Sequence, residues 1–438
     1  MAEAFTPSTI DRIAKQAREP SWVTDLRRDS LRRHAELPWP HPSDDIWRRV
    51  DVSLLDPQRG FAPANGSLQQ RIPLTEAQLA AWTQPMGGEE LAVRVNGAWL
   101  VPPTQRRAHI EEFALAAGHQ ADPLRDAIIA DGLTDAEQKL STLNLAFHHD
   151  DLAVTVPAGT GGEAPIRLVR VIGASAGQAL FPLTVIRVGA GSKVTIIDEY
   201  VSLSQDPGPH LINSRIELVV DPDASVHYIR LQRWAPQARE FLLQRTTLGR
   251  GATLTLANIN LGAALSKAHI VTKLVSPDAS TKLYGFVFGK GGQQIDQHTL
   301  LDHQAPNTTS DLQFKAALQD HSRMVYTGLI RIGKDAVKTQ AYQANHNLML
   351  SKSAKAETIP MLEILADDVQ CKHGASVGPI DDEQTFYLMS RGIAREAAQR
   401  LVVMGFIESI IQQVPFEPLQ ERLREEIEGS IHSEEAAA

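Results

Sequence analysis

The sequence predicts a mainly β protein, a parallel β-helix flanked by helical regions at both ends. Two observations favour this fold. Short runs of strand-forming residues fill the middle of the chain, and a three-residue pattern recurs among them at a nearly constant interval. The chain has 438 residues, a length that favours two or three structural units over one compact core.

Residues 1–150 are predicted to form an N-terminal, mainly helical region. Asp122–Pro123 is typical of a helix start, with aspartate as the cap and proline in the first turn. Thr134 and Glu137 have the spacing of a capping box before another apolar helical pattern. The pattern changes near Phe147, which places the end of this region at about residue 150.

Residues 151–378 are predicted to form the β-helix core. Its recurring triplets each lead into a strand-like run, and their central alanines lie 28 and then 27 residues apart, with a fourth alanine 57 residues further on. A regular period indicates stacked units that bury their apolar faces against one another. A β-sandwich with accidental spacing is the alternative. The triplets are Asp223–Ala224–Ser225, Gly251–Ala252–Thr253, Asp278–Ala279–Ser280 and Asp335–Ala336–Val337.

Residues 379–438 are predicted to be a C-terminal helical region. Acidic residues at 381–383 suit a helix start, where the helix dipole favours negative charge. Residues 401–407 are apolar nearly all round, so we expect neighbours to enclose them. The charged segment 421–428 is predicted to be a solvated acidic helix.

The composition disfavours several classes of protein. A net charge of -9 argues against a nucleic-acid binder, which usually carries a basic face. Apolar runs stay below the roughly 18 residues needed to cross a bilayer, so we expect no membrane span. Met1–Ile10 lacks the pattern of a signal peptide, which leads us to expect a cytoplasmic protein.

The candidate site is the segment Ala366–Ala375, which holds the single cysteine of the chain, Cys371. On a strand, Cys371 and His373 share a face about 6.6 Å apart, close enough for thiolate and imidazole to bind one iron or zinc ion. One cysteine cannot hold a cluster alone, so any such site must use other ligand types or a second chain. The alternative is a buried thiol beside a polar histidine.

Other motifs are weaker. Gly285–Lys290 resembles a phosphate-binding loop, but its spacing is one residue short and Gly291 replaces the Ser or Thr that would bind magnesium, so a strand and turn are expected. His148–Asp151 could hold a metal, although solvation at an element boundary is the more common role. We therefore predict no catalytic residue.

One block of sequence is specific enough to indicate a family. Residues 357–407 closely resemble the carboxy-terminal signature of SufB/SufD proteins, and weaker resemblance extends over the rest of the chain. The Cys-x-His-Gly-Ala form resembles SufD. The motifs are Glu357–Pro360, Leu362–Ile364, Asp367–Ala375, Asp382–Leu388 and Ser390–Ile393.

The resemblance implies a right-handed parallel β-helix in a non-catalytic subunit of the SUF iron–sulfur cluster assembly complex. It implies a SufB paralogue and two copies of the SufC ATPase as partners, with sulfur arriving from a cysteine desulfurase and its carrier. Cys371 and His373 match the positions of the nascent cluster site shared with SufB. The chain alone is then expected to bind no cofactor tightly, only transient iron or a cluster at that interface.

Together with the sequence pattern, the resemblance also predicts which residues contact each partner. Residues 381–414 are expected to dock SufC, and the strands between Leu348 and Ala375 are expected to contact SufB. The alternative function is a stand-alone β-helix enzyme acting on polysaccharide. The lack of clustered acids or bases in the sequence counts against it.

Overall fold

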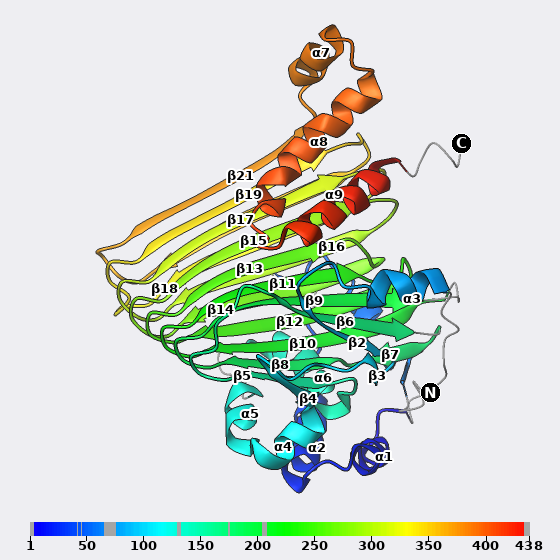
Figure 1. Cartoon of the computed structure of the whole chain (residues 1–438), viewed down its shortest axis with the longest axis vertical. Coiled ribbons are helices and arrows are strands. Elements are labelled where there is room, and N and C mark those ends of the chain that lie inside the picture. Colours follow the sequence, from blue (N-terminus) through cyan, green and yellow to red (C-terminus); the bar gives the residue numbers. More distant parts are fainter. Residues whose placement is uncertain are drawn as a thin grey trace.

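The computed structural model describes residues 4–41, 43–44, 46–64, 76–128, 133–173, 176–203 and 208–432. Its centre is a parallel β-helix in which the chain alternates between two sheets, with helices at both ends of the sequence packed outside (Figure 1). The predicted fold class is confirmed. Pairing is antiparallel only where the described strands begin, at β2–β3 and β4–β5.

The two sheets stack their strands in steps of two along the chain. Sheet A contains, in spatial order, β20 (Lys355–Ile364), β18 (Arg323–Ile332), β16 (Gln294–His303), β14 (Leu265–Leu274), β12 (Ala238–Leu248), β10 (His210–Val220), β8 (Leu183–Val188), β5 (Leu152–Val156) and β4 (His109–Glu112), with β7 (Gln178–Leu180) beside β10 and β1 (Ala62–Pro63) beside β7. Sheet B contains β21 (Gln370–Pro379), β19 (Gln340–Met349), β17 (Thr309–Leu318), β15 (Ser280–Gly289), β13 (Thr253–Asn260), β11 (Ser225–Arg233), β9 (Lys193–Leu203), β6 (Ile166–Gly173), β2 (Glu90–Val95) and β3 (Ala98–Val101).

The first three repeat triplets are the corners that precede successive strands of sheet B. In each, the first residue has a positive φ. The alanine that follows is buried, because only a small side chain fits inside the turn. The prediction for the fourth triplet is wrong, because Asp335–Ala336–Val337 does not form such a corner. The equivalent corner is Lys338–Thr339, and Ala336 lies two residues before Lys338. There, Thr308 and Thr339 take the place of the small residue and hydrogen-bond to each other at 3.0 Å.

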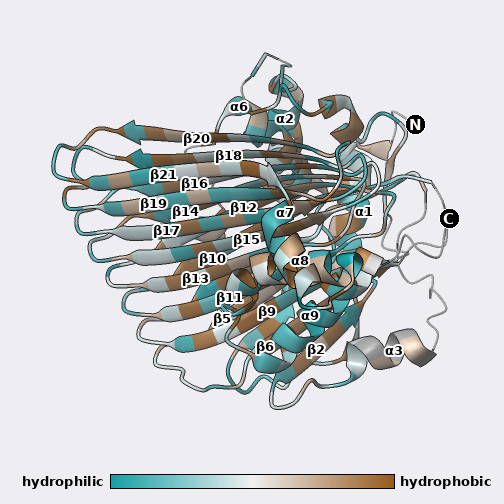
Figure 2. Ribbon diagram, turned by 90° about the horizontal axis from the view of Figure 1, so that it is seen from above, coloured by the Kyte–Doolittle hydropathy of each residue, from teal (hydrophilic) through white to brown (hydrophobic). Residues whose placement is uncertain are grey.

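The helices cover the outer faces of the two sheets on opposite sides of the β-helix (Figure 2). On the N-terminal side, α6 packs Leu140, Leu143 and Phe147 against sheet A, and its predicted capping box is present. The N-terminal elements are α1 (Pro7–Ala17), α2 (Ser21–Glu36), the 3-10 helix η2 (Val52–Leu55), α3 (Glu76–Thr83), α4 (Phe113–His119), α5 (Ala121–Ile128) and α6 (Asp135–Phe147). Asp122 lies in the first turn of α5, two residues after the cap position at Gln120.

The C-terminal helices are α7 (Asp382–Ser390), α8 (Arg395–Ile411) and α9 (Glu417–His432). Helix α8 is not enclosed as predicted: Val403 and Ile407 are buried against sheet B, whereas Leu401 is 52% exposed. Helix α9 is solvated on one face only: Glu421, Glu425 and Glu428 are exposed as predicted. Its other face buries Leu419, Leu423 and Ile427 in the same cluster. Within the described residues, no helix is long and apolar enough to cross a membrane.

Candidate functional site

Cys371 and His373 lie on β21, the last strand of sheet B. Their partners in register on β19 are Ala341 and Gln343, whose side chains are almost completely buried in the interior of the β-helix. Because parallel strands in register carry equivalent side chains on the same face, Cys371 and His373 point in the interior direction. Among the described residues no further strand stacks on β21, so His373 is exposed and Cys371 is half-buried.

The whole last turn shares this geometry. In sheet A, Ile330 and Ile332 are 0% exposed, while Leu362 and Ile364 in register with them on β20 are 37% and 41% exposed. Val377 on β21 is 47% exposed. The interior of the β-helix is therefore open at its C-terminal end. We call this surface, formed by the interior-facing residues of β20 and β21, the open end.

The pair of candidate ligands is incomplete in this chain. Burial raises the pKa of the Cys371 thiol, so it stays protonated at neutral pH until a metal or a cationic partner binds it. Among the described residues, no third His, Cys, Asp or Glu joins the pair in a metal-binding group. The arrangement can hold iron or a cluster only when further ligands come from another molecule.

Comparisons with known proteins identify the family of the chain. Residues 171–406, more than half of the chain, match the family described as "SUF system FeS cluster assembly, SufBD core domain". The chain belongs to the SufBD family. An "Iron-sulfur cluster assembly SufBD family protein" of Staphylococcus epidermidis is 25% identical over 98% of this chain and 94% of its own length. A SufBD family protein of Synechocystis is 26% identical over 93% of this chain and 91% of its own length.

Family membership assigns the chain to iron–sulfur cluster assembly. Both relatives are named for this process rather than for polysaccharide chemistry. The matched region contains almost the whole β-helix, including the open end with Cys371 and His373. Neither the family description nor the relatives' names assign a role to these two residues, so their role stays a prediction.

The weaker motifs have structural roles. Gly285–Gly289 lies within β15 and is followed by a turn, as the sequence indicated. The expectation that 148–151 is solvated is wrong. His148 is fully buried, with its Nδ1 2.5 Å from an Asp151 carboxylate oxygen, and Arg94 lies 3.1 Å from Asp150. These ion pairs join the end of α6 to the first turn of the β-helix.

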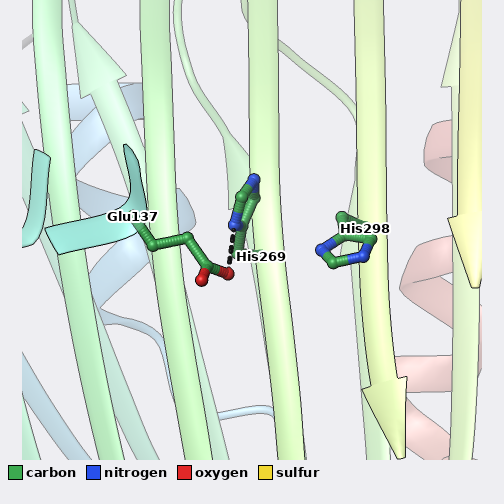
Figure 3. Close-up of side chains that lie close together, drawn as sticks. All are labelled: Glu137, His269 and His298. Carbon is green, nitrogen blue, oxygen red and sulfur yellow. Dashed lines mark hydrogen bonds and ion pairs between the residues drawn. The ribbon is translucent and has the colours of Figure 1, made fainter. Parts of the chain in front are cut away.

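Sequence reasoning missed a buried group of Glu137, His269 and His298 (Figure 3). Glu137 comes from α6, and the two histidines lie in register on neighbouring strands β14 and β16. Burial lowers the pKa of His298 to about 3, which keeps it neutral. Burial alone would raise the pKa of Glu137, but the hydrogen bond from His269 contributes to lowering it to about 2. The available signal was the 29-residue separation of the histidines, close to the repeat period.

A row of buried charges inside the β-helix was missed as well. Arg170 is 3.0 Å from Asp198, whose other bonds come from the hydroxyls of Tyr200 and Tyr228, and Arg230 pairs with Glu240. Each charge has a partner, as burial in a low dielectric requires. The signal was present as polar residues at interior positions of apolar strands.

Proposed function

We propose that this chain is the SufD-like, non-catalytic scaffold subunit of a SufBCD-type assembly complex. It pairs with a SufB-like paralogue through the open end and docks a SufC-like ATPase through α7 and α8. The observation that carries this proposal is the uncovered interior at the last turn, where Leu362, Ile364 and Val377 are exposed. A molecule that stacks on it completes the core.

The open end favours a paralogous partner for two reasons. Strands β20 and β21 are the edges of their sheets, and unpaired backbone groups on an edge strand can hydrogen-bond a strand from another chain. A SufB-like protein with the same fold would offer a matching edge and its own interior residues. Cys371 and His373 would then lie at the junction, beside ligands from the paralogue.

The cargo at this junction is iron and sulfide. Sulfur would arrive through the paralogue from a cysteine desulfurase and its carrier, and the nascent cluster would be bound transiently by both subunits. Cys371 and His373 supply a soft thiolate and a borderline imidazole, which suit iron. The complex would act in the cytoplasm, and the ATPase would supply its only nucleotide chemistry.

The proposed ATPase contact lies on α7 and α8. Helix α7 projects beyond the end of the sheets (Figure 1) and exposes Phe386 and Tyr387 at 71% and 58%. A groove of about 950 Å³ runs beside it, lined partly by Tyr387, Leu401 and Phe406. Exposed aromatic side chains beside an apolar groove are typical of a protein contact.

The pairing is tested by Leu362→Glu, expressed with the SufB-like and SufC-like proteins of the same organism. A buried carboxylate at the junction should reduce recovery of the paralogue at least ten-fold, because desolvating an unpaired charge is costly. Leu115→Glu is the matched control, since Leu115 on α4 is 63% exposed and far from the open end in the fold. Undiminished recovery with Leu362→Glu would reject the open end as the contact.

The ATPase contact is tested by Phe386→Ala with Tyr387→Ala. We expect loss of the ATPase from the purified complex with the paralogue retained. Point variants are preferable to removing residues 381–438, because α8 and α9 cover apolar residues of sheet B such as Ile229 and Phe286. Full ATPase recovery in the double variant would exclude this surface.

A further inference from the structure

The group of Glu137, His269 and His298 is built like a metal site. One ligand atom from each residue can be chosen so that all lie within 4.8 Å of one another. All three side chains are buried, with exposures of 5%, 0% and 7%. In Figure 3, the His298 ring points toward His269 from the neighbouring strand, and Glu137 reaches His269 from the other side.

The two imidazoles are held in place by the fold. His269 and His298 are paired in register on β14 and β16, and their ring centroids are 5.1 Å apart. The Trp47 ring lies 5.1 Å from the His269 ring and closes the group on one side. Rigid strands and a packed aromatic ring restrict the rotamers of these ligands, which favours a preorganised site.

Part of this group has a purely structural explanation. One Glu137 oxygen accepts hydrogen bonds at 2.8 Å from the backbone and hydroxyl of Thr134, completing the capping box of α6. Its other oxygen lies 2.8 Å from Nδ1 of His269, an interaction that joins helix to sheet. His298 plays no part in this clamp.

Two buried nitrogen atoms remain unexplained by the clamp. Nε2 of His269 and Nδ1 of His298 have no hydrogen-bond partner among the described residues. Leaving a buried polar atom unpaired costs about 1–3 kcal/mol. An ion bound by both Glu137 and His269 would replace the 2.8 Å hydrogen bond at Nδ1 of His269, so of the two unpartnered nitrogen atoms it would satisfy Nδ1 of His298.

We propose that Glu137, His269 and His298 bind one divalent transition-metal ion, Zn²⁺ or Fe²⁺. Two imidazoles and a carboxylate with an open position suit either ion. The nearby Lys267 is neutralised by Asp296 at 2.9 Å, so the Glu137 carboxylate leaves the surroundings with one net negative charge. The inference concerns a site separate from the open end and does not depend on the proposed function.

The bound ion would join three elements. It would link α6 to β14 and β16, so the N-terminal helices and the middle of sheet A would be held together more firmly. Any ligand that binds the folded state alone raises the melting temperature with its concentration. This gives a readout that needs no cluster-assembly activity.

The experiment uses the full chain carrying Cys371→Ser and His373→Ala, which removes the candidate ligands at the open end. The chain is freed of metal with a chelator and titrated with Co²⁺ as an optical probe. Zn²⁺ and anaerobic Fe²⁺ are then titrated against a chromophoric chelator. We expect one equivalent of each ion, visible Co²⁺ bands, a raised melting temperature, and tighter binding of Zn²⁺ than of Fe²⁺.

Adding His298→Ala should weaken binding at least ten-fold and abolish the metal-dependent rise in melting temperature. The matched control adds His210→Gln, since His210 is also buried and both its ring nitrogen atoms are unpartnered among the described residues. If His298→Ala fails to fold, His298→Gln serves in its place. Absence of binding to the starting chain, or unchanged binding after loss of His298, would overturn the proposal.

Discussion

At the scale of the residue, His373 and Gln343 occupy equivalent positions on neighbouring turns of the β-helix. They differ mainly in solvent exposure, because a further turn covers Gln343 and none of the described strands covers His373. Gln343 is 3% exposed and lies within the β-helix, whereas His373 is exposed at the open end. A side chain that packs against little in its own chain contributes little to stability, usually within 0.5 kcal/mol. Its imidazole is therefore available to bind iron in the proposed complex with the partner.

We expect His373→Ala to lower the iron and sulfide content of the reconstituted complex several-fold while its melting temperature and ATP hydrolysis stay unchanged. Cys371→Ser should have a comparable effect if the thiolate is a true ligand, and a smaller one if the thiol mainly packs. Lys372→Ala is the control, since its side chain lies on the opposite face of β21. A normal cluster content in His373→Ala would remove His373 from the site, and a loss seen only with unfolding would indicate packing.

His210 predicts a pH dependence of stability. Burial lowers its pKa to about 4 in the folded protein, against about 6.5 in an unfolded chain. The unfolded state therefore binds the extra proton first, and this contribution to stability is complete above pH 6.5 and is lost between pH 6.5 and pH 4. At pH 5 the loss is about 2 kcal/mol.

Urea denaturation at pH 7 and pH 5 should therefore show a smaller loss of stability in His210→Gln than in the parent. His34 and His303 have pKa values lowered to about 4 by burial, so some acid sensitivity should remain. An identical loss in parent and variant would show that His210 is not a neutral group of the folded state.

At the scale of the element, the apolar residues of α8 lie in two environments, one packed against sheet B and one exposed beside α7. Ile407 is 0% exposed against sheet B, while Leu401 on the same helix is 52% exposed and lines the groove beside α7. Ion pairs hold the next helix to the same sheet, since Arg233 bonds Glu426 of α9 at 2.6 Å.

Ile407→Ala should destabilise the protein by about 2–5 kcal/mol, the usual cost of truncating a buried aliphatic side chain. Leu401→Ala should change stability by less than about 0.5 kcal/mol but weaken ATPase binding. Chemical denaturation and co-purification distinguish the two. Equal destabilisation by both substitutions would mean that α8 is enclosed on all sides, as its sequence suggested.

At the scale of the whole molecule, the β-helix has different ends. Its N-terminal end is covered by α4, α5 and antiparallel strands, whereas at the C-terminal end the edges of β20 and β21 pair with no other described strand. In a parallel edge strand, only some of the backbone N–H and C=O groups form hydrogen bonds within their own sheet. The rest are available to a neighbour.

Hydrogen exchange should therefore report the pairing. In the isolated chain, about half of the amides of β20 and β21 should exchange quickly, and addition of the SufB-like partner should slow them at least ten-fold. The inner strands β10 to β14 serve as the internal control, because both their edges are already paired. Unchanged exchange in β20 and β21 on complex formation would place the contact elsewhere.

The sequence by itself determined the parallel β-helix, the capping box at Thr134 and the segment that identifies the family. These features are local or periodic: a repeat of 27 to 28 residues, a two-residue alternation and a cap all lie within short windows. The same locality explains the error at Ala336, where longer turns moved the corner and a threonine pair replaced the alanine.

Only the tertiary structure decided what lies inside, outside and at the end. Leu362 and Ile330 are equally apolar, and stacking alone makes one exposed and the other buried. Glu137 and His269 are 132 residues apart, so their contact depends on how α6 packs on sheet A. Burial and side-chain contacts depend on neighbours distant in the chain, which explains why the exposure of the open end and the contact between Glu137 and His269 could not be found from residue patterns alone.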